Sequence, residues 1–160
     1  MENKICVYAI CKNEEQFVDR WYESVKEADY ICVLDTGSTD NTVEKLKEHR
    51  IRVEQKIINP WRFDVARNES LKLVPEDCNI LICLDLDEVL EAGWAEKVKK
   101  AWVPGITRLQ HEFVWSHTDS GAELRTYIAN RVHDKSWTWK YPVHELLCKD
   151  NASDSEFAYV

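Results

Sequence analysis

The chain of 160 residues contains no apolar run close to the roughly 20 residues that a membrane-spanning helix needs. Its N-terminus, Met1 to Lys4, lacks the basic-then-apolar pattern of a secretion signal, and no internal repeat is visible. A composition of 44% hydrophobic and 31% charged residues is typical of one globular domain that buries roughly 70% of its unfolded surface. These features predict a cytoplasmic protein without a transmembrane segment.

The sequence also has no C-x-x-C pair, although it contains six cysteines: Cys6, Cys11, Cys32, Cys78, Cys83 and Cys148. Cys6, Cys32 and Cys83 lie within apolar segments, where a free cysteine behaves as a small hydrophobic residue. We therefore expect reduced packing residues rather than disulfides or a zinc site.

Positive charge is scarce, because 21 Lys and Arg residues stand against 29 Asp and Glu residues and give a formal net charge of −8. A charge of this sign repels the phosphate backbone of nucleic acid, which argues against nucleic acid as a main partner. A smaller ligand with phosphate groups would need a metal ion or local basic side chains to offset this field.

Apolar segments and amphipathic segments alternate along the first two thirds of the chain. Continuous apolar runs predict buried strands over 4–11, 30–34 and 80–83, and a less regular strand is expected over 51–58. Residues at helical spacing lie between these runs. This alternation predicts an α/β fold with a mostly parallel sheet between helices.

Each expected helix has its own start signal. Apolar residues recur at three- and four-residue steps from Phe17 to Ala28. Asn41 and Glu44 resemble a capping box, and Asp64 is the expected N-cap of a helix that ends before Pro75. Gly93 precedes the last expected helix.

The pattern changes after Pro104. Segments 106–115 and 124–132, joined by a turn at 118–121, predict antiparallel strands. The sequence thus predicts one domain over 1–160, with a wound half at 1–103, a smaller antiparallel part at 104–148 and a tail at 149–160. The tail is polar until Phe157, where another strand begins.

Acidic residues follow the strand over 80–83 at once. Asp85 and Asp87 are two residues apart, so a bend after the strand would let both reach one hard metal ion. The alternative is a solvated acidic turn that simply ends the strand. Because ligands bind beyond the carboxyl ends of parallel strands, residues 12–14, Asp35 and 85–88 are expected to meet in one crevice.

Four segments in this order resemble the inverting glycosyltransferases of family 2, which have the GT-A fold, a Rossmann-like arrangement. The segments are Asn13-Glu14, 35–42, 64–68 and 85–88. Arg125, Arg131 and the run Val143-His144-Glu145 are similar to a branch of that family that includes bacterial peptide S-glycosyltransferases. The two halves would then bind the nucleotide sugar and the acceptor.

The resemblance implies transfer of a hexosyl group (EC 2.4) from a nucleotide-diphosphate sugar, chiefly a UDP-sugar, with Mn²⁺ or Mg²⁺. Asp87 would bind the metal and so help to neutralise the charge on the leaving nucleotide. Asp85 would lie near ribose or sugar hydroxyls, and Asp35 and Glu14 near ribose or base. The full expected binding set is Ile10, Asn13, Glu14, Asp35, Asp64, Arg67, Asp85 and Arg131.

Several of these assignments have structural alternatives. Glu14 could instead stabilise a helix N-terminus by its charge. Arg67 is expected to contact phosphate or to hold Asp64, and the alternative is a surface ion pair.

Inversion requires a base that takes the proton of the acceptor, and Glu145 is the candidate. His144 would be a metal or pyrophosphate contact. The alternative for the pair is a packed, hydrogen-bonded strand. His111, His117 and His133 are expected at the surface.

Two departures from the family pattern bear on activity. Thr36 stands where many relatives carry a second acidic residue, and the chain ends before a strand that often supplies a further histidine in that branch. These departures are consistent with a minimal member of the family, with a shortened chain or with one part of a longer protein. The competing functions are a non-catalytic nucleotide-sugar-binding module and an inactive, truncated transferase. The seven tryptophans point either to a ring-stacking acceptor surface or to a core.

Overall fold

Seven strands form one mixed sheet in the computed structural model, which describes residues 3–152 and 156–160. The strand order is β3-β2-β1-β4-β6-β5-β9. The bounds are β1 Ile5–Cys11, β2 Tyr30–Asp35, β3 Arg52–Gln55, β4 Ile80–Cys83, β5 Arg108–His117, β6 Glu123–His133 and β9 Phe157–Tyr159.

The first four strands are parallel to one another, as the alternation of segments predicted. β6 runs antiparallel to β4 and to β5, and β9 lies parallel to β5. The expected antiparallel part and the late strand at Phe157 are therefore confirmed. β3 is shorter than the expected 51–58. A second small sheet of β7 Thr138–Lys140 and β8 Leu146–Cys148 was not predicted, because its strands are too short to leave a pattern.

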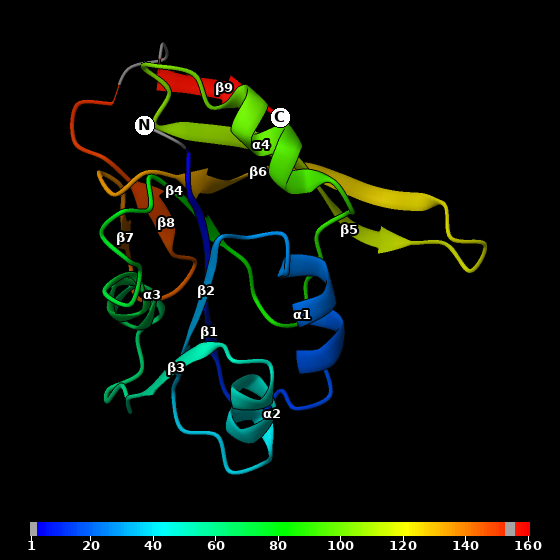
Figure 1. Cartoon of the computed structure of the whole chain (residues 1–160), viewed down its shortest axis with the longest axis vertical. Helices are drawn as coiled ribbons and strands as arrows, with labels where there is room; N and C mark the ends of the chain where they lie inside the picture. The colour runs from blue at the N-terminus through cyan, green and yellow to red at the C-terminus, as the bar shows by residue number, and fades with distance from the viewer. Residues whose placement is uncertain (1–2, 153–155) are drawn as a thin grey trace.

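Helices cover both faces of the wound half (Figure 1). They are α1 Val18–Val25, α2 Thr42–Glu48, α3 Phe63–Leu71 and α4 Trp94–Ala101. Helices α1, α2 and α4 pack against the face that carries Ile5, Val7 and Ala9 of β1. The α3 helix and the β7–β8 sheet cover the face that carries Cys6, Tyr8 and Ile10. Because both faces are covered, every residue of β1 is buried.

The cysteine prediction is confirmed, because all six cysteines are free and five of them are buried. The tryptophans divide between the two alternatives: Trp21, Trp94, Trp137 and Trp139 are core residues, whereas Trp61 and Trp115 are exposed. Each helix in the described part of the chain is too short or too polar to cross a bilayer.

One predicted helix start is wrong, and one predicted capping box does not form. Arg62, not Asp64, is the N-cap residue of α3, and Asp64 lies inside the first turn. Asn41 is the N-cap residue of α2 but makes no side-chain cap. Instead, Glu15 Oε2 accepts a bond from the Asn41 N–H at 2.8 Å, and Asp40 Oδ1 accepts one from the Thr42 N–H at 3.0 Å.

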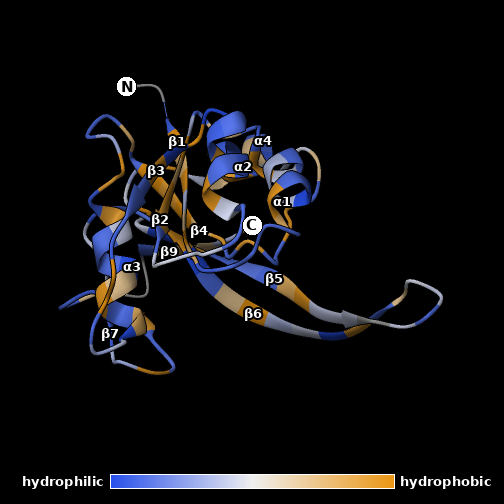
Figure 2. Ribbon diagram, turned by 90° about the horizontal axis from the view of Figure 1, so that it is seen from below, coloured by the Kyte–Doolittle hydropathy of each residue, from blue (hydrophilic) through white to orange (hydrophobic). Residues whose placement is uncertain are grey.

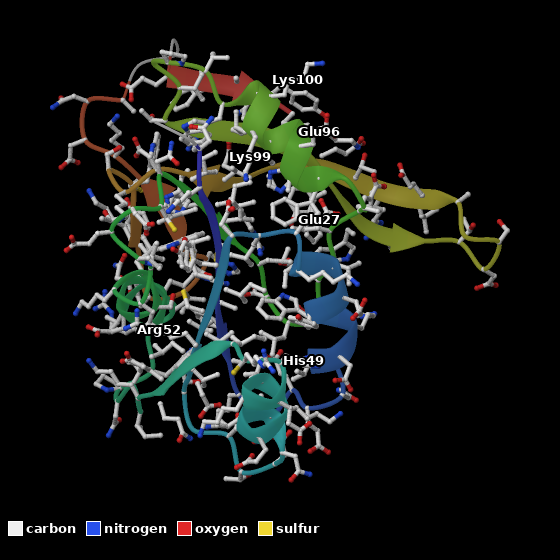
Figure 3. The ribbon with its side chains drawn as sticks, in the orientation of Figure 1. Glu27, His49, Arg52, Glu96, Lys99 and Lys100 are labelled. Atoms are coloured by element: carbon white, nitrogen blue, oxygen red, sulfur yellow. The ribbon has the colours of Figure 1, made fainter. Side chains whose placement is uncertain are left out.

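The start of α4 is held by a carboxylate from the segment after α1. Glu27 accepts hydrogen bonds from the N–H groups of Gly93, at 2.8 Å, and Ala95, at 3.3 Å. Figure 3 labels Glu27 between the two helices. This contact satisfies orphan donors at the helix N-terminus, which Gly93 itself has no side chain to do.

His133 is fully buried, so its expected surface position is wrong. Its Nε2 lies 2.7 Å from the hydroxyl of Tyr8, and its Nδ1 lies 2.7 Å from the carbonyl of Asp134. Burial lowers the pKa of His133 to about 4, so the ring is neutral at pH 7. The His111 ring is half-buried, and the side chain of His117 lies outside the described part of the structure.

Candidate active site

A cleft of about 270 Å³ opens at the carboxyl ends of β1, β2 and β4, where parallel strands deliver their loops to one edge. Its lining residues are Ile10, Cys11, Lys12, Glu14, Thr36, Trp61, Phe63, Arg67, Asp85 and Asp87. The predicted convergence is confirmed for Glu14, Asp85 and Asp87. Asp35 does not line the cleft, although the next residue, Thr36, does.

Asp35 is fully buried and organises the loop that follows β2. It accepts hydrogen bonds from the N–H groups of Gly37 and Ser38, each at 3.1 Å, and from Gln55 Nε2 at 3.3 Å. The Ser38 hydroxyl donates to it as well. Burial alone would raise the pKa of Asp35, but these donors hold it below its ordinary value. A direct contact with ribose would require these bonds to rearrange.

The loops after β1 and β2 are joined to each other by Asn13. Its backbone N–H donates to Ser38 Oγ at 2.8 Å, and its Oδ1 accepts from the Thr39 N–H at 2.7 Å. The residue adopts a left-handed conformation with φ of 56°, which asparagine tolerates better than most residues. Asn13 therefore holds the two loops together and does not line the cleft.

Arg67 of α3 is the central cation of the site, and its side chain is only 5% exposed. Its Nη1 and Nη2 donate to the two oxygens of Asp85 at 2.7 and 2.9 Å, and its Nε donates to Glu145 at 2.8 Å. The expected pairing of Arg67 with Asp64 is wrong, as is the alternative of a surface pair. Asp64 is 7% exposed and is bound instead by the guanidinium of Arg62.

Arg131 of β6 brings a second cation to Asp85. Its Nη1 donates to Glu88 at 2.7 Å and approaches Asp85 at 3.5 Å. Burial would raise the pKa of Asp85, but the two guanidinium groups hold it below its ordinary value. Asp85 is therefore a fixed carboxylate whose negative charge is paired with two guanidinium groups. This fits its expected role beside sugar or ribose hydroxyls better than a role as a metal ligand.

Asp87 is exposed, lines the cleft and makes no ion pair within the described part of the chain. Only its backbone carbonyl is bonded, by Arg20 at 2.7 Å. Burial, and then repulsion from Asp87 and Asp85, raises the pKa of Glu14 to about 7. The cleft thus holds uncompensated negative charge on hard oxygen atoms.

This donor set fits a hard divalent cation only in part. Carboxylate oxygens are the ligands that Mg²⁺ and Mn²⁺ prefer. However, no group of three His, Cys, Asp or Glu side chains within 3–152 and 156–160 is arranged to hold a metal. His144 is exposed, has φ of 54° and does not line the cleft. Further ligands would have to come from the oxygens of a bound diphosphate or from water.

Sequence reasoning missed the aromatic wall of the cleft. The ring centroids of Trp61 and Phe63 lie 5.1 Å apart in an edge-to-face arrangement, and both residues line the cleft. The signal was the aromatic loop at Pro60, which the sequence marked as a break after a strand but not as part of a site. Lys12 and Thr36 were likewise not assigned to the binding set.

A scan against protein-family models matches residues 6–105 to Glycosyl transferase family 2. A search of curated proteins finds no match. Among solved structures, the chain is similar to the mannosyltransferase PcManGT from Pyrobaculum calidifontis in complex with GDP-Man and Mn²⁺. That pair has a TM-score of 0.57 and 18% identity, over 68% of this chain and 35% of that one.

Two further structures give the same result. S. aureus TarS 1-349 in complex with UDP-GlcNAc has a TM-score of 0.60 and 17% identity, over 76% of this chain and 37% of that one. Glucosyl-3-phosphoglycerate synthase from Mycobacterium tuberculosis, in complex with Mn²⁺ and UDP-Glc, has a TM-score of 0.55 and 21% identity, over 68% and 43%.

The matched region of each neighbour is therefore less than half of that protein's length. At these identities the likeness establishes the fold, and the GT-A expectation is confirmed. The family match covers residues 6–105 and includes every strand and loop that lines the cleft. The chain belongs to glycosyl transferase family 2.

Proposed function

We propose that the protein transfers a sugar from a nucleotide-diphosphate sugar to an acceptor, with inversion and with Mn²⁺ or Mg²⁺. The observation that carries this proposal is the pair of unlike carboxylates at one strand end. Asp87 is exposed and unpaired in the cleft, while Asp85 is neutralised by two arginines. The structural neighbours crystallised with UDP-GlcNAc, UDP-Glc or GDP-Man support a nucleotide-sugar donor, and a UDP-sugar is the proposed one.

Asp87 is the proposed metal-binding residue, with His144 as a second contact to the metal or to pyrophosphate. A bound cation would supply positive charge to the diphosphate as the nucleotide leaves. His144 is exposed beside Glu145 on the loop between β7 and β8. Reaching the cleft would require this loop to move, because His144 does not line it.

Glu145 is the proposed base. Arg67 binds its Oε1 at 2.8 Å, and its side chain is 15% exposed. Glu145 does not line the cleft, so the acceptor would have to reach it from the side of the β7–β8 loop. The acceptor oxygen forms a bond to the anomeric carbon while the bond from that carbon to the donor phosphate oxygen breaks. The electron pair leaves with the nucleoside diphosphate, and the acceptor proton passes to Glu145.

Residues 1–103 would bind the donor and 104–148 the acceptor. We place the chain in the branch with the Val143-His144-Glu145 motif. Support for this comes from Arg131, which binds Glu88, and from Glu145, which is bound by the same guanidinium of Arg67 that binds Asp85.

A binding module without catalysis is the second candidate. It is favoured by the ion pair between Arg67 and Glu145, because this contact already gives Glu145 a structural role in joining α3 to the loop between β7 and β8. Under this alternative the cleft binds a nucleotide sugar, and Glu145 has only a structural role.

Calorimetric titration with UDP, with and without Mn²⁺, tests both candidates when combined with a UDP-glucose hydrolysis assay. Mn²⁺-dependent UDP binding with release of glucose supports the transferase. Binding without release supports the module. If neither UDP nor GDP binds in the presence of Mn²⁺ or Mg²⁺, both candidates are wrong.

A further inference from the structure

Three aromatic rings lie in contact on one face of the β5–β6 hairpin. Phe113 and Tyr127 are paired across the two strands, and their ring centroids are 5.0 Å apart. Trp115 lies 6.4 Å from Phe113 and 6.5 Å from Tyr127. We call Phe113, Trp115 and Tyr127 the aromatic platform.

The platform is not part of the core. Among the described residues, β6 pairs with β4 only through Val132 and His133, and β5 pairs with β9 only over 108–110. The rest of the hairpin extends away from the body of the protein (Figures 1 and 2). Trp115 is 67% exposed and Tyr127 is 43% exposed. Adjacent aromatic rings that are exposed to solvent are typical of a surface that binds a ligand or a partner protein.

Arg131 connects the platform to the active-site cleft. It lies on the same strand as Tyr127, beyond a β-bulge in the pairing of β5 with β6. Its guanidinium lies 5.8 Å from the ring of Phe113 and donates to Glu88 at 2.7 Å. One side chain thus contacts both the aromatic platform and the acidic turn that leads into the cleft.

We propose that the aromatic platform binds the acceptor and that this acceptor is a glycan. This proposal rests on the proposed function and concerns the acceptor, the second substrate of the transfer. A pyranose ring has a face of C–H bonds bordered by hydroxyl groups. The faces of Trp115 and Tyr127 match the apolar part. Arg125, two residues before Tyr127 on the same strand, and Arg131, beside the ring of Phe113, offer N–H donors to the hydroxyls.

The exposed area argues against a second copy of the chain as the occupant. An aromatic side chain buries about 150–250 Å², so the exposed parts of three such rings amount to a few hundred Å² at most. A stable protein interface buries about 800 Å² on each partner. A few sugar rings, in contrast, would cover the platform fully.

Saturation-transfer NMR with chitotriose, cellotriose and maltotriose tests the inference. The wild type should transfer saturation to the C–H protons of at least one trisaccharide, and Trp115→Ala and the double variant Trp115→Ala/Tyr127→Ala should lose this signal. The matched control is Ile128→Ala, because Ile128 is 50% exposed on the same hairpin and its side chain points to the opposite face. The control should keep the signal, and circular dichroism melts should show that all variants fold.

Absence of a signal with all three trisaccharides, its survival in the double variant or its loss in Ile128→Ala would each overturn the glycan assignment. Conversion of a dimer to a monomer by the double variant in sedimentation would also overturn it, in favour of a self-association surface. UDP binding with Mn²⁺ is measured on the same samples. Failure of UDP binding alone counts against the proposed function, and failure of trisaccharide binding alone counts against the platform.

Discussion

Arg67 and Glu145 are 78 residues apart in the sequence, yet Nε of Arg67 donates to Oε1 of Glu145 at 2.8 Å. The same guanidinium binds both oxygens of Asp85 and lies 5.2 Å from the ring of Trp139. A single buried cation therefore joins the strand end of the expected donor half to the loop that carries the proposed base.

Arg67→Met should destabilise the protein strongly, because it leaves two carboxylates without their buried partner. Loss of one member of a buried ion pair costs about 3–5 kcal/mol. Urea unfolding of the metal-free protein measures the change. Arg62→Met is the control, since Arg62 is 46% exposed in its pair with Asp64 and such pairs contribute about 1 kcal/mol or less. Equal losses in the two variants would contradict a special role of Arg67.

Tyr8→Phe should also destabilise the fold. The Tyr8 oxygen accepts from Trp139 Nε1 at 2.8 Å and lies 2.7 Å from Nε2 of His133. The neutral His133 ring donates from Nδ1 to the carbonyl of Asp134, so its Nε2 accepts from the Tyr8 hydroxyl. Phenylalanine would leave two buried polar atoms unsatisfied, at about 1–3 kcal/mol each. The melting temperature should fall by several degrees. Tyr141→Phe, at a side chain that is 55% exposed, should change it little; a similar fall in both would refute the network.

The stability of the metal-free protein should decrease with rising pH in the window set by Glu14. Its pKa is raised from 4.5 to about 7, so between these values the folded state binds more protons than the unfolded state. This contribution is complete below pH 4.5 and is lost as the pH rises through 7. Melting curves from pH 5 to 8 should fall more steeply for the wild type than for Glu14→Gln.

Glu23→Gln serves as the control for the pH series, because Glu23 is 63% exposed and lies outside the cleft. Its melting curves should keep the wild-type pH dependence. Parallel curves for the wild type and Glu14→Gln would show that Glu14 does not titrate in this window.

Asp87→Asn should weaken Mn²⁺-dependent UDP binding at least tenfold, which corresponds to about 1.4 kcal/mol. Calorimetric titration measures this change in affinity. The stability should change by no more than about 0.5 kcal/mol, because the side chain is exposed and unpaired within the described residues. Asp119→Asn, at the exposed turn of the hairpin, is the matched control. Unchanged UDP binding in Asp87→Asn would remove Asp87 from the metal assignment.

Much of the fold followed from local patterns. Apolar runs become buried strands because both sides of the sheet are covered, and residues at helical spacing become helices that supply that cover. Acidic residues directly after Cys83 had to emerge at the strand end, because a buried unpaired charge is costly. The convergence of Glu14, Asp85 and Asp87 was predictable for this reason.

The sequence by itself therefore determined the succession of strands and helices along residues 1–103, the family resemblance and the edge of the sheet at which the acidic residues meet. Only the tertiary structure decided which partner each charge takes: Arg67 binds Asp85 and Glu145 rather than Asp64, Asp35 is buried and accepts hydrogen bonds from its own loop and from Gln55, and His133 is in the core. The physical reason is that periodicity acts between neighbours along the chain. Hydrogen bonds and ion pairs depend on distances between segments that are set only when the sheet and its connections are assembled.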